Sequence, residues 1–264
     1  MTPHGAARYP DLAGLSVFIS GGASGIGAAF VTQFAAQGCR VTFIDIDDGA
    51  ASALAQQVHA NLEAPALHYV HCDVRDVPAL RRAIAEADKT HGALRVLINN
   101  AARDDRHSFP DVTPQYWDDN LALNLRHHFF AAQAVAPMMA QAGGGSIINL
   151  GSVSWMRGRT ELAAYTTAKA GIHGLTRTLA RELGPQRIRV NCIVPGAIAT
   201  PRQQALWVSD EQEAAFLDAQ CLKFRLSADD VARTALFLAS DEARGITGQN
   251  LIVDAGLAQT SASV

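Results

Sequence analysis

A tyrosine and a lysine, four positions apart in a stretch with helical periodicity, are the residues best suited to acid–base chemistry. Tyr165 and Lys169 share one helix face at this spacing. A phenol has a pKa of about 10, so it is a poor base at neutral pH unless a neighbouring ammonium favours the phenolate. Lowering that pKa by about 3 units corresponds to about 4 kcal/mol, a reasonable effect between close charges. The pair predicts a proton-transfer centre, although a surface pair on a solvated helix has the same spacing.

Two further polar residues, Ser152 and Asn124, occupy positions from which they could contribute to this proton-transfer centre. Ser152 follows the apolar run 146–150, at the carboxyl end of a predicted parallel strand, where ligands bind in sheets of this kind. Its hydroxyl can hold a substrate oxygen beside the tyrosine. Asn124 lies inside the otherwise apolar helical stretch 121–130, where helix propensity disfavours asparagine. Asn124 is therefore expected to have a polar role, the alternative being a satisfied amide of the core.

A glycine-rich loop follows the first predicted strand and opens a helix. Residues 20–27 read Ser-Gly-Gly-Ala-Ser-Gly-Ile-Gly. Glycines let the backbone turn sharply and approach a pyrophosphate, to which the helix N-terminus offers free N–H groups. The spacing GxxxGxG differs from the strict GxGxxG fingerprint, so an ordinary strand–helix turn is the alternative for this loop alone.

An aspartate ends the second predicted strand. Asp45 lies where a carboxylate can accept hydrogen bonds from both hydroxyls of the adenosine ribose, and its charge would repel a 2′-phosphate. The loop has no Arg or Lys to attract that phosphate, so NAD is favoured over NADP. Asp45 could instead cap the following helix, with Asp47 and Asp48 as rivals for that position.

Short apolar runs and amphipathic stretches alternate along the whole chain. The runs predicted as strands are 15–20, 40–45, 67–72, 94–99, 146–150, 187–194 and 250–253. Helices are expected from near residue 25, after 47, after 76, a long one after 113, over 162–183 and after 227. This alternation predicts an α/β fold: a single-domain Rossmann-type, doubly wound, parallel seven-stranded sheet with helices on both faces. Residues 1–264 form the domain, with an N-terminal tail at 1–13 and a substrate lid at 197–226.

Composition narrows the possible partners. The chain has 264 residues, 18% of them charged, and a net charge of -3, which gives no footprint for nucleic acid or an anionic membrane. No run has the roughly 18 apolar residues of a membrane span, and the start lacks a signal-peptide core. The cysteines are widely spaced, so no metal site is expected, and the location predicted is the cytoplasm.

The motifs together resemble the short-chain dehydrogenase/reductase family over about residues 15–256. The matching residues are Ser20-Gly21-x-x-x-Gly25-Ile26-Gly27, Asp73-Val74, Asn99-Asn100-Ala101, Asn124, Ser152, Tyr165-x-x-x-Lys169 and Pro195-Gly196. The sequence departs from the family pattern at Ser20, usually Thr, at Ala102, usually Gly, and at Gly151, often Ser. None of these changes removes a group needed for proton transfer.

The resemblance implies a role for each site residue. Tyr165 would be the acid/base, Lys169 would lower its pKa and hold the nicotinamide ribose, and Ser152 would orient the substrate oxygen. Asn124 would hold a water that relays protons to Lys169. The cofactor is implied to be NAD, bound by Gly21, Ser24, Gly25, Ile26, Gly27, Asp45, Ile46, Asp73, Val74, Asn100, Ala101, Tyr165, Lys169, Pro195, Gly196, Ile198 and Thr200. Family members are often tetramers, so a homotetramer or homodimer is expected.

Within the family, the chain is similar to bacterial aldose 1-dehydrogenases that act on xylose, arabinose or galactose. The similar segments are 99–107, 124–127, 154–155 and 219–223. Asp105, Arg106, Ser154 and Trp155 are the candidate sugar-binding residues, and Asp104, His107, Arg157, Arg159 and Glu161 could supply further polar groups. The alternative for these charged residues is a solvated loop or salt bridges that order it.

The expected function is therefore NAD-dependent oxidation of an aldose at C1, giving an aldonolactone and NADH. Two alternatives stay within the family: a dehydrogenase of a polyol or other secondary alcohol, or a reductase of a 3-oxoacyl thioester. A third is a dinucleotide-binding sensor without catalysis, because a fold alone does not give a function. The presence of Ser152, Tyr165 and Lys169 together argues against the sensor.

Overall fold

The predicted strands form one parallel seven-stranded sheet in the computed structural model, which describes residues 7–61, 65, 67–200 and 210–259. Every adjacent pair is parallel. The order across the sheet is β3 (His68–His71), β2 (Arg40–Asp45), β1 (Ser16–Ser20), β4 (Leu94–Asn99), β5 (Gly145–Leu150), β6 (Ile188–Pro195) and β9 (Asn250–Val253). The order reverses between β1 and β4, which places a ligand crevice at the carboxyl ends of these strands.

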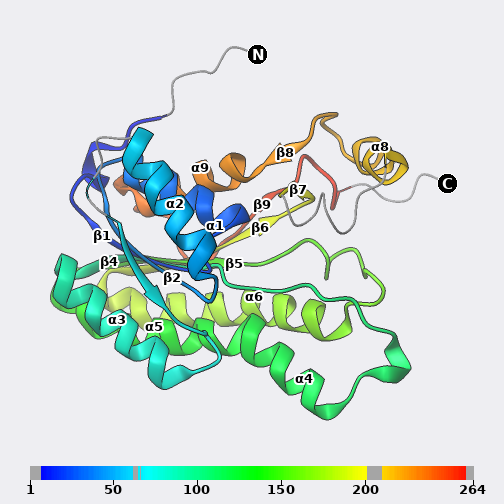
Figure 1. Ribbon diagram of the computed structural model, residues 1–264, viewed down its shortest axis with the longest axis horizontal. Coiled ribbons are helices and arrows are strands. Elements are labelled where there is room, and N and C mark those ends of the chain that lie inside the picture. The colour runs from blue at the N-terminus through cyan, green and yellow to red at the C-terminus, as the bar shows by residue number, and fades with distance from the viewer. Residues whose placement is uncertain (1–6, 62–64, 66, 201–209, 260–264) are drawn as a thin grey trace.

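Helices cover both faces of the sheet (Figure 1). One layer contains α1 (Gly25–Ala36), α2 (Asp48–Asn61) and α9 (Ala228–Ala239), and the other contains α3 (Val77–His91), α4 (Pro114–Leu121), α5 (His127–Gln141) and α6 (Ala163–Leu183). In β1, Val17 and Ile19 pack into the first layer and Phe18 into the second. Successive strand residues point to opposite faces, so a strand buried on both sides is apolar throughout. The expected doubly wound Rossmann-type fold is confirmed.

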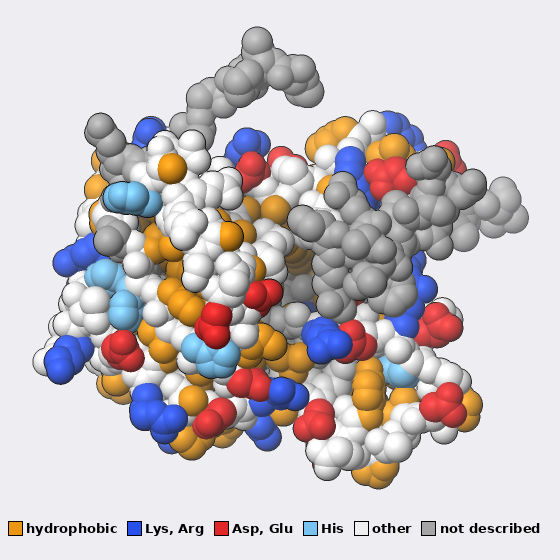
Figure 2. All heavy atoms as spheres, in the orientation of Figure 1, with side chains coloured by type: hydrophobic (Ala, Val, Ile, Leu, Met, Phe, Trp, Pro, Cys, Tyr) orange, Lys and Arg blue, Asp and Glu red, His pale blue; other side chains and the backbone are white. Residues whose placement is uncertain are grey.

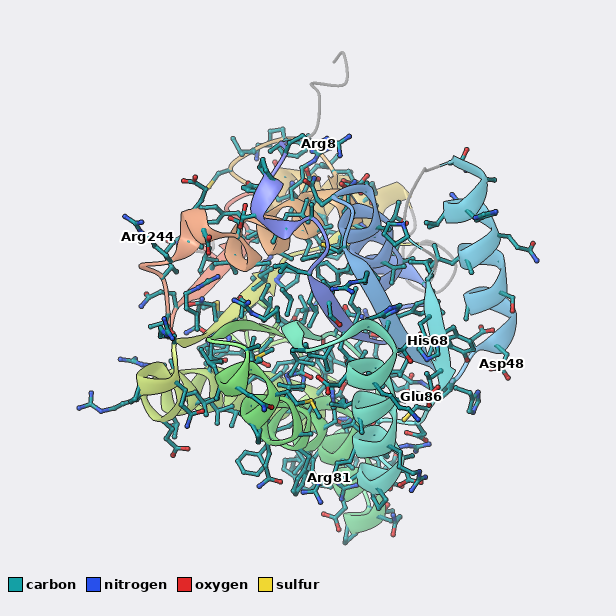
Figure 3. The ribbon with its side chains drawn as sticks, turned by 90° about the vertical axis from the view of Figure 1, so that its left-hand side faces the viewer. Arg8, Asp48, His68, Arg81, Glu86 and Arg244 are labelled. Atoms are coloured by element: carbon teal, nitrogen blue, oxygen red, sulfur yellow. The ribbon has the colours of Figure 1, made fainter. Side chains whose placement is uncertain are left out.

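Local signals fix the ends of several helices. The Asp76 carboxylate accepts a hydrogen bond from the Ala79 N–H at 2.9 Å and caps α3, which ends before Gly92. The Ser227 and Asp230 side chains form a reciprocal capping box at the start of α9. At the edge of the sheet, the His68 and Glu86 side chains meet at 3.1 Å and join β3 to α3 (Figure 3).

The long helix expected after Thr113 is interrupted. It begins as α4, widens into the π-helical turn η3 (Ala122–Arg126) and continues as α5. A π turn accommodates one extra residue and often marks a functional site. Leu125 of this turn packs closely against Gly171 of α6, where an added Cβ would lie 3.1 Å from the leucine. The interruption therefore lies beside the helix that carries Tyr165 and Lys169.

The segments predicted as an N-terminal tail, 1–13, and as a substrate lid, 197–226, both contain ordered structure where they are described. Arg8 donates a hydrogen bond to the Ala36 carbonyl at 2.6 Å, and Leu12 is buried, so residues 7–13 pack against the end of α1 (Figure 3). Residues 1–6 of the expected tail and 201–209 of the expected lid lie outside the described residues. The rest of the lid contains β7 (Ile198–Ala199), α8 (Asp210–Ala219) and β8 (Leu226–Ser227), and β7 pairs with β8.

The surface shows no large patch of one charge on the face seen in Figure 2, where acidic and basic side chains are interspersed. Among the described helices, none is long and apolar enough to cross a membrane. Cys39, Cys72 and Cys192 are buried, as their apolar surroundings in the sequence predict, and Cys221 is exposed. All four are free thiols.

Candidate active site

The glycine loop has a shape that only glycine permits. Gly21 and Gly25 have φ angles of 66° and 55°, in the left-handed region. A Cβ on Gly27 would lie 1.8 Å from the Gly21 carbonyl oxygen, and one on Gly21 would lie 2.7 Å from the Ala101 Cα. The loop is therefore a close-packed backbone turn, which is the form needed for a pyrophosphate to approach.

The segment after the neighbouring strand β4 holds this loop in place by hydrogen bonds. The Asn100 amide donates to the Ser20 carbonyl at 3.1 Å and to the Gly21 carbonyl at 2.8 Å. The Ser20 hydroxyl accepts from the Asn100 and Ala101 N–H groups at 3.0 and 3.2 Å. The serine found in place of the family's threonine thus keeps the hydroxyl that ties β1 to β4. Asn100 supports the loop, and its predicted contact with the cofactor stays a prediction.

The first turn of α1 fits an anionic ligand. Its N-cap residue Ser24 makes no side-chain capping hydrogen bond, and the first turn contains no acidic residue. The first N–H groups of the helix thus receive no hydrogen bond from the Ser24 side chain, and they carry the positive end of the helix dipole. Thr200 lies over the loop, since a Cβ on Gly25 would be 3.5 Å from its Cγ2. The cradle that the sequence predicts, made of the glycine turn and the open helix start, is therefore present, and the binding of a pyrophosphate there stays a prediction.

Asp45 lies beside this cradle. One carboxylate oxygen accepts from the Ala23 N–H at 2.9 Å, and the other accepts from the Ile46 N–H at 2.8 Å. The cap of α2 is Asp47, which accepts from the Ala50 N–H at 2.9 Å, so the interpretation of Asp45 as that cap is wrong. The Ile46 side chain is 61% exposed at the same edge. Asp45 is thus placed at the edge of the crevice where the adenosine ribose is expected.

More acidic groups surround Asp45. Burial and the charges of Asp48, Asp45 and Asp47 raise the pKa of Tyr69. The Tyr69 hydroxyl donates to the Asp48 carboxylate at 2.6 Å, and the hydrogen bonds from Tyr69 and His71 lower the pKa of Asp48. Several carboxylates therefore converge on this corner of the sheet.

The predicted adenine contacts lie at the end of β3. The Asp73 carboxylate forms an ion pair with Arg75, whose guanidinium donates at 2.6 and 2.9 Å. This hydrogen bonding keeps the pKa of Asp73 below its usual value, despite partial burial. Val74 is buried. The position agrees with the family motif, and the adenine contact itself stays a prediction.

Lys169 is a buried lysine under the reacting end of the crevice. It is 1% exposed, and its amine donates to the Leu150 carbonyl at 2.8 Å. The same amine lies 5.6 Å from the centre of the Tyr165 ring. Burial lowers the pKa of the lysine to about 8, while the Cys192 thiol and Asp104 oppose this shift. The predicted shared face is therefore present, and the helix is buried there rather than solvated.

Tyr165 and Ser152 are brought together as expected, but the pKa of the tyrosine departs from expectation. Burial of the hydroxyl raises it, Asp104 raises it further, and the hydrogen bond with Ser152 lowers it. Lys169 is not among the groups that shift it. The lowering predicted from the i, i+4 spacing is therefore not found, because desolvation of the phenol is the largest influence on this pKa and raises it. Ser152 also donates to the Ser154 hydroxyl at 2.9 Å.

Asn124 lies in the π turn, where its amide is satisfied by the protein. It accepts from the Arg103 N–H at 2.9 Å and donates to the Arg103 carbonyl at 3.1 Å and to Asn120 at 3.0 Å. These contacts match the alternative of a satisfied core amide. They also join the π turn to the segment after β4. The water-holding role implied by the resemblance stays a prediction.

Two histidines that the sequence did not single out lie under the same site. His127 and His128 are fully buried, and their rings are 4.3 Å apart. Their ring nitrogens contact the Ala101 carbonyl at 3.0 Å and the Asn149 amide oxygen at 3.1 Å. Burial and the charge of Lys169 lower the pKa of His127 to about 3, so it is neutral. The signal available was a pair of imidazoles within an apolar helical stretch.

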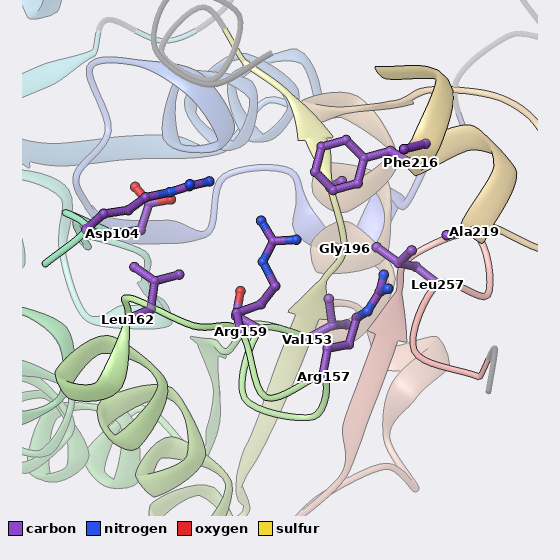
Figure 4. Close-up of a pocket in the computed structure, with 13 residues that line it drawn as sticks. Asp104, Val153, Arg157, Arg159, Leu162, Gly196, Phe216, Ala219 and Leu257 are labelled. Atoms are coloured by element: carbon purple, nitrogen blue, oxygen red, sulfur yellow. The ribbon is translucent and has the colours of Figure 1, made fainter. Parts of the chain in front are cut away.

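A cavity of about 350 Å³ opens beside Ser152 (Figure 4). Of the predicted sugar-binding residues, Arg106 and Ser154 line it. Asp105 instead forms an ion pair with Arg103 at 2.7 Å, and Trp155 donates to His173 at 3.2 Å, so neither is among the lining residues. Asp104, Arg157 and Arg159, which were predicted as further polar groups, also line it. The rest of the wall includes Gly196, predicted on the nicotinamide side, and Val153, Leu162 and Phe216.

The predicted nicotinamide side lies along the same wall. Pro195 ends β6, and its carbonyl accepts from the Val153 N–H at 3.1 Å. Ile198 is buried in β7. Phe216 of α8 and Leu257 line the cavity from the side of the expected lid. The cavity is thus lined by Val153 and Ser154, which follow Ser152 in the chain, and by Gly196 and Ala197, which follow β6.

The fold and this site together define an oxidoreductase class. The family model described as enoyl-(acyl carrier protein) reductase matches residues 21–258. The chain belongs to the short-chain dehydrogenase/reductase family, whose dehydrogenases use a nicotinamide dinucleotide.

Curated relatives cover nearly the full chain. It is 49% identical over 253 residues to the "Probable galactose dehydrogenase GalD" of Rhizobium meliloti, covering 96% of this chain and 98% of the relative. It is 48% identical over 251 residues to D-xylose 1-dehydrogenase of Caulobacter vibrioides, with 95% and 98% covered. Among solved structures, 3-oxoacyl-[acyl-carrier protein] reductase of Brucella melitensis has a TM-score of 0.87 at 30% identity, with 96% and 94% covered.

Proposed function

We propose that this chain oxidises an aldose at C1 with NAD, giving an aldonolactone and NADH. The observation that carries the proposal is a cavity lined by charged side chains and by the Ser154 hydroxyl, which accepts a hydrogen bond from Ser152. A sugar offers many hydroxyls, and such a wall supplies the donors and acceptors they need. The similarity to galactose and xylose dehydrogenases supports the same substrate class.

The residues of the chain then divide the work. Ser152 holds the anomeric oxygen, and Tyr165 takes its proton. Lys169, fixed on the Leu150 carbonyl, supplies a positive charge below the phenol and reaches the nicotinamide ribose. When bound, NAD supplies a cationic nicotinamide that accepts the hydride from C1. Because burial and Asp104 raise the pKa of Tyr165, the proton-accepting form gains population as the pH rises.

The preference for NAD over NADP rests on Asp45 and its neighbours. Asp45, Asp47 and Asp48 place negative charge around the expected ribose position. A 2′-phosphate carries close to two negative charges at neutral pH and would be repelled there. The glycine loop contains no Arg or Lys to offset this repulsion.

We further propose that residues 197–226 close over the bound sugar and exclude water. Phe216 of α8 lines the cavity, and the Arg159 guanidinium lies 5.8 Å from the centre of its ring. The enzyme is proposed to work in the cytoplasm as a homotetramer or homodimer. Phe129 on α5 and Ile252 on β9 are 40% and 37% exposed, which suits burial against further subunits. Light scattering would give the subunit number.

The test is an absorbance assay for NADH with neutral pentoses and hexoses, polyols and simple secondary alcohols. We expect turnover with at least one aldose and little with the polyols. Turnover of a polyol without turnover of any aldose would contradict the proposal and favour the polyol alternative. Tight NADH binding without turnover of any alcohol would favour the sensor.

A reductase of a 3-oxoacyl thioester is the second candidate, because the family model and the Brucella structure bear such descriptions. The charged lining of the cavity argues against a long acyl chain, which prefers apolar walls. Consumption of NADH or NADPH with a 3-oxoacyl thioester separates the two candidates in the same assay.

A further inference from the structure

The cavity beside Ser152 has an excess of positive charge. Arg106, Arg157 and Arg159 line it, and Asp104 is the carboxylate among the lining residues. Arg157 and Arg159 come from the loop between β5 and α6. Figure 4 shows the Arg159 guanidinium pointing into the space between Asp104 and Phe216, and the Arg157 guanidinium pointing towards Leu257. Two positive groups of one short loop therefore line the same cavity.

Of these arginines, Arg106 has an acidic partner, whereas Arg157 and Arg159 have none among the residues that the structure describes. Arg106 lies 3.7 Å from the Glu161 carboxylate. Among the described residues, no carboxylate lies within ion-pair distance of Arg157 or Arg159. Burial lowers the pKa of Arg159, and the charges of Arg106 and Arg157 lower it further. Crowding like charges in a partly desolvated space costs free energy, and an anion bound between them would offset that cost.

We infer that the aldose taken by this site carries an anionic group, a carboxylate or a phosphate, which Arg157 and Arg159 bind at the end remote from C1. This inference rests on the function proposed above and narrows its substrate class. A guanidinium matches both anions with two parallel hydrogen bonds, which a neutral hydroxyl cannot do. Asp104, on the opposite wall, can only accept hydrogen bonds, for example from hydroxyl groups. The neutral hydroxyls of the substrate are therefore expected near Asp104, and its anionic group near Arg157 and Arg159.

A neutral sugar would leave part of the cavity lining without a complementary group. Hydroxyls can accept hydrogen bonds from guanidinium groups, but they do not neutralise the charge that Arg157 and Arg159 share. Ser154 and Asp104 already supply a donor and acceptors for sugar hydroxyls. Arg157 and Arg159 have no carboxylate partner among the described residues, and an anion would use both their charge and their N–H donors.

The experiment compares kcat/KM within two series of matched stereochemistry: galactose, galacturonate and galactose 6-phosphate, and glucose, glucuronate and glucose 6-phosphate. We expect one anionic member to exceed its neutral parent by about tenfold or more, the size of one charge-assisted hydrogen bond. Added salt should reduce this advantage, because the contact is electrostatic and partly exposed. The two arms identify the anion as carboxylate or phosphate.

Variants locate the effect. The double change Arg157→Gln and Arg159→Gln should remove the preference for the anionic member, lowering its kcat/KM far more than that of the neutral parent. Each single change should remove part of it, which keeps the test valid if the double variant is unstable. Arg244→Gln is the matched control, since this exposed arginine (Figure 3) is not among the residues that line the cavity, and both rates should stay unchanged.

The outcomes are distinguishable. If neutral aldoses are oxidised and no anionic member exceeds its parent, the inference is overturned and the proposed function stands. If the preference exists but survives the double change, Arg157 and Arg159 do not carry it and the inference is likewise overturned. If no aldose of either kind reduces NAD, the proposed function fails and the inference fails with it.

Discussion

The two halves of the crevice are built in different ways. The dinucleotide half is made of backbone: left-handed glycines, carbonyls held by Asn100, and N–H groups at the start of α1. The substrate half is made of charged side chains on the loops after β4 and β5 and of α8. Backbone geometry is set by local steric rules, whereas the direction of a long side chain depends on distant partners. We therefore expect the first half to bind the cofactor and the second half to select the substrate.

The largest effect is expected where the halves meet. Tyr165→Phe removes the hydroxyl that takes the proton but keeps the ring, so turnover should fall on the order of 10³-fold. Affinity for NADH should stay close to that of the wild type, measured by fluorescence titration. A variant that turns over at the wild-type rate would refute the proton role. A variant that also loses NADH binding would show that the Tyr165 hydroxyl contributes to cofactor binding as well as to proton transfer.

The next effect tests the backbone half. Gly27→Ala places a Cβ 1.8 Å from the Gly21 carbonyl oxygen. Overpacking of this kind costs about 1–3 kcal/mol, so the dissociation constant of NADH should rise about 10- to 100-fold. Gly245→Ala is the control, because a Cβ there meets nothing within 4 Å. Unchanged NADH affinity in the Gly27 variant would mean that the loop adapts and is not a fixed cradle.

A smaller effect is expected from the charge beside that cradle. Asp45→Asn keeps the shape of the side chain and removes its charge, so the preference for NAD over NADP should fall by about tenfold or more. The measurement is the ratio of kcat/KM for the two cofactors. Asp88→Asn on α3 should leave the ratio unchanged. A ratio that does not move in the Asp45 variant would place the discrimination elsewhere, in Asp47 or Asp48.

The smallest effect links the substrate half to the acid–base pair. The carboxylate of Asp104 raises the pKa of Tyr165, because a negative charge disfavours the phenolate. Activity requires the deprotonated form, so kcat should rise with pH, and Asp104→Asn should move this rise to lower pH. The check is the pH profile at saturating NAD, with Asp105→Asn as control. A profile that moves to higher pH, or stays in place, would contradict the assignment.

The sequence predicts the sheet and the cradle well because both depend on local patterns. Each strand is a continuous apolar run, and the loop shape follows from the glycines at 21, 25 and 27. The partners of the loop, Asn100 and Ser20, also follow from a family motif. The interruption at η3 does not, because a single extra residue in a helix leaves no clear mark in an apolar pattern.

The substrate wall could be predicted only in part. Arg106 and Ser154 do line the cavity, whereas Asp105 and Trp155 find partners in Arg103 and His173. The loop after β5 turns through left-handed conformations at Gly158 and Glu161, and its Glu161 carbonyl accepts from the His107 N–H at 2.9 Å. Such turns decide which charges face inward. They depend on the pairing of two loops that are far apart in the sequence, which one-dimensional patterns do not record.

The π turn at residues 122–126 determines the directions in which the side chains of the following helix, α5, point. One additional residue rotates the rest of a helix by about 100° around its axis. The Asn124 amide thereby reaches the Arg103 backbone, while His127 and His128 contact Ala101 and Asn149. Deleting a single residue there would rotate His127 and His128 away from these partners relative to Asn124, although Ser152, Tyr165 and Lys169 would all still be present in the chain.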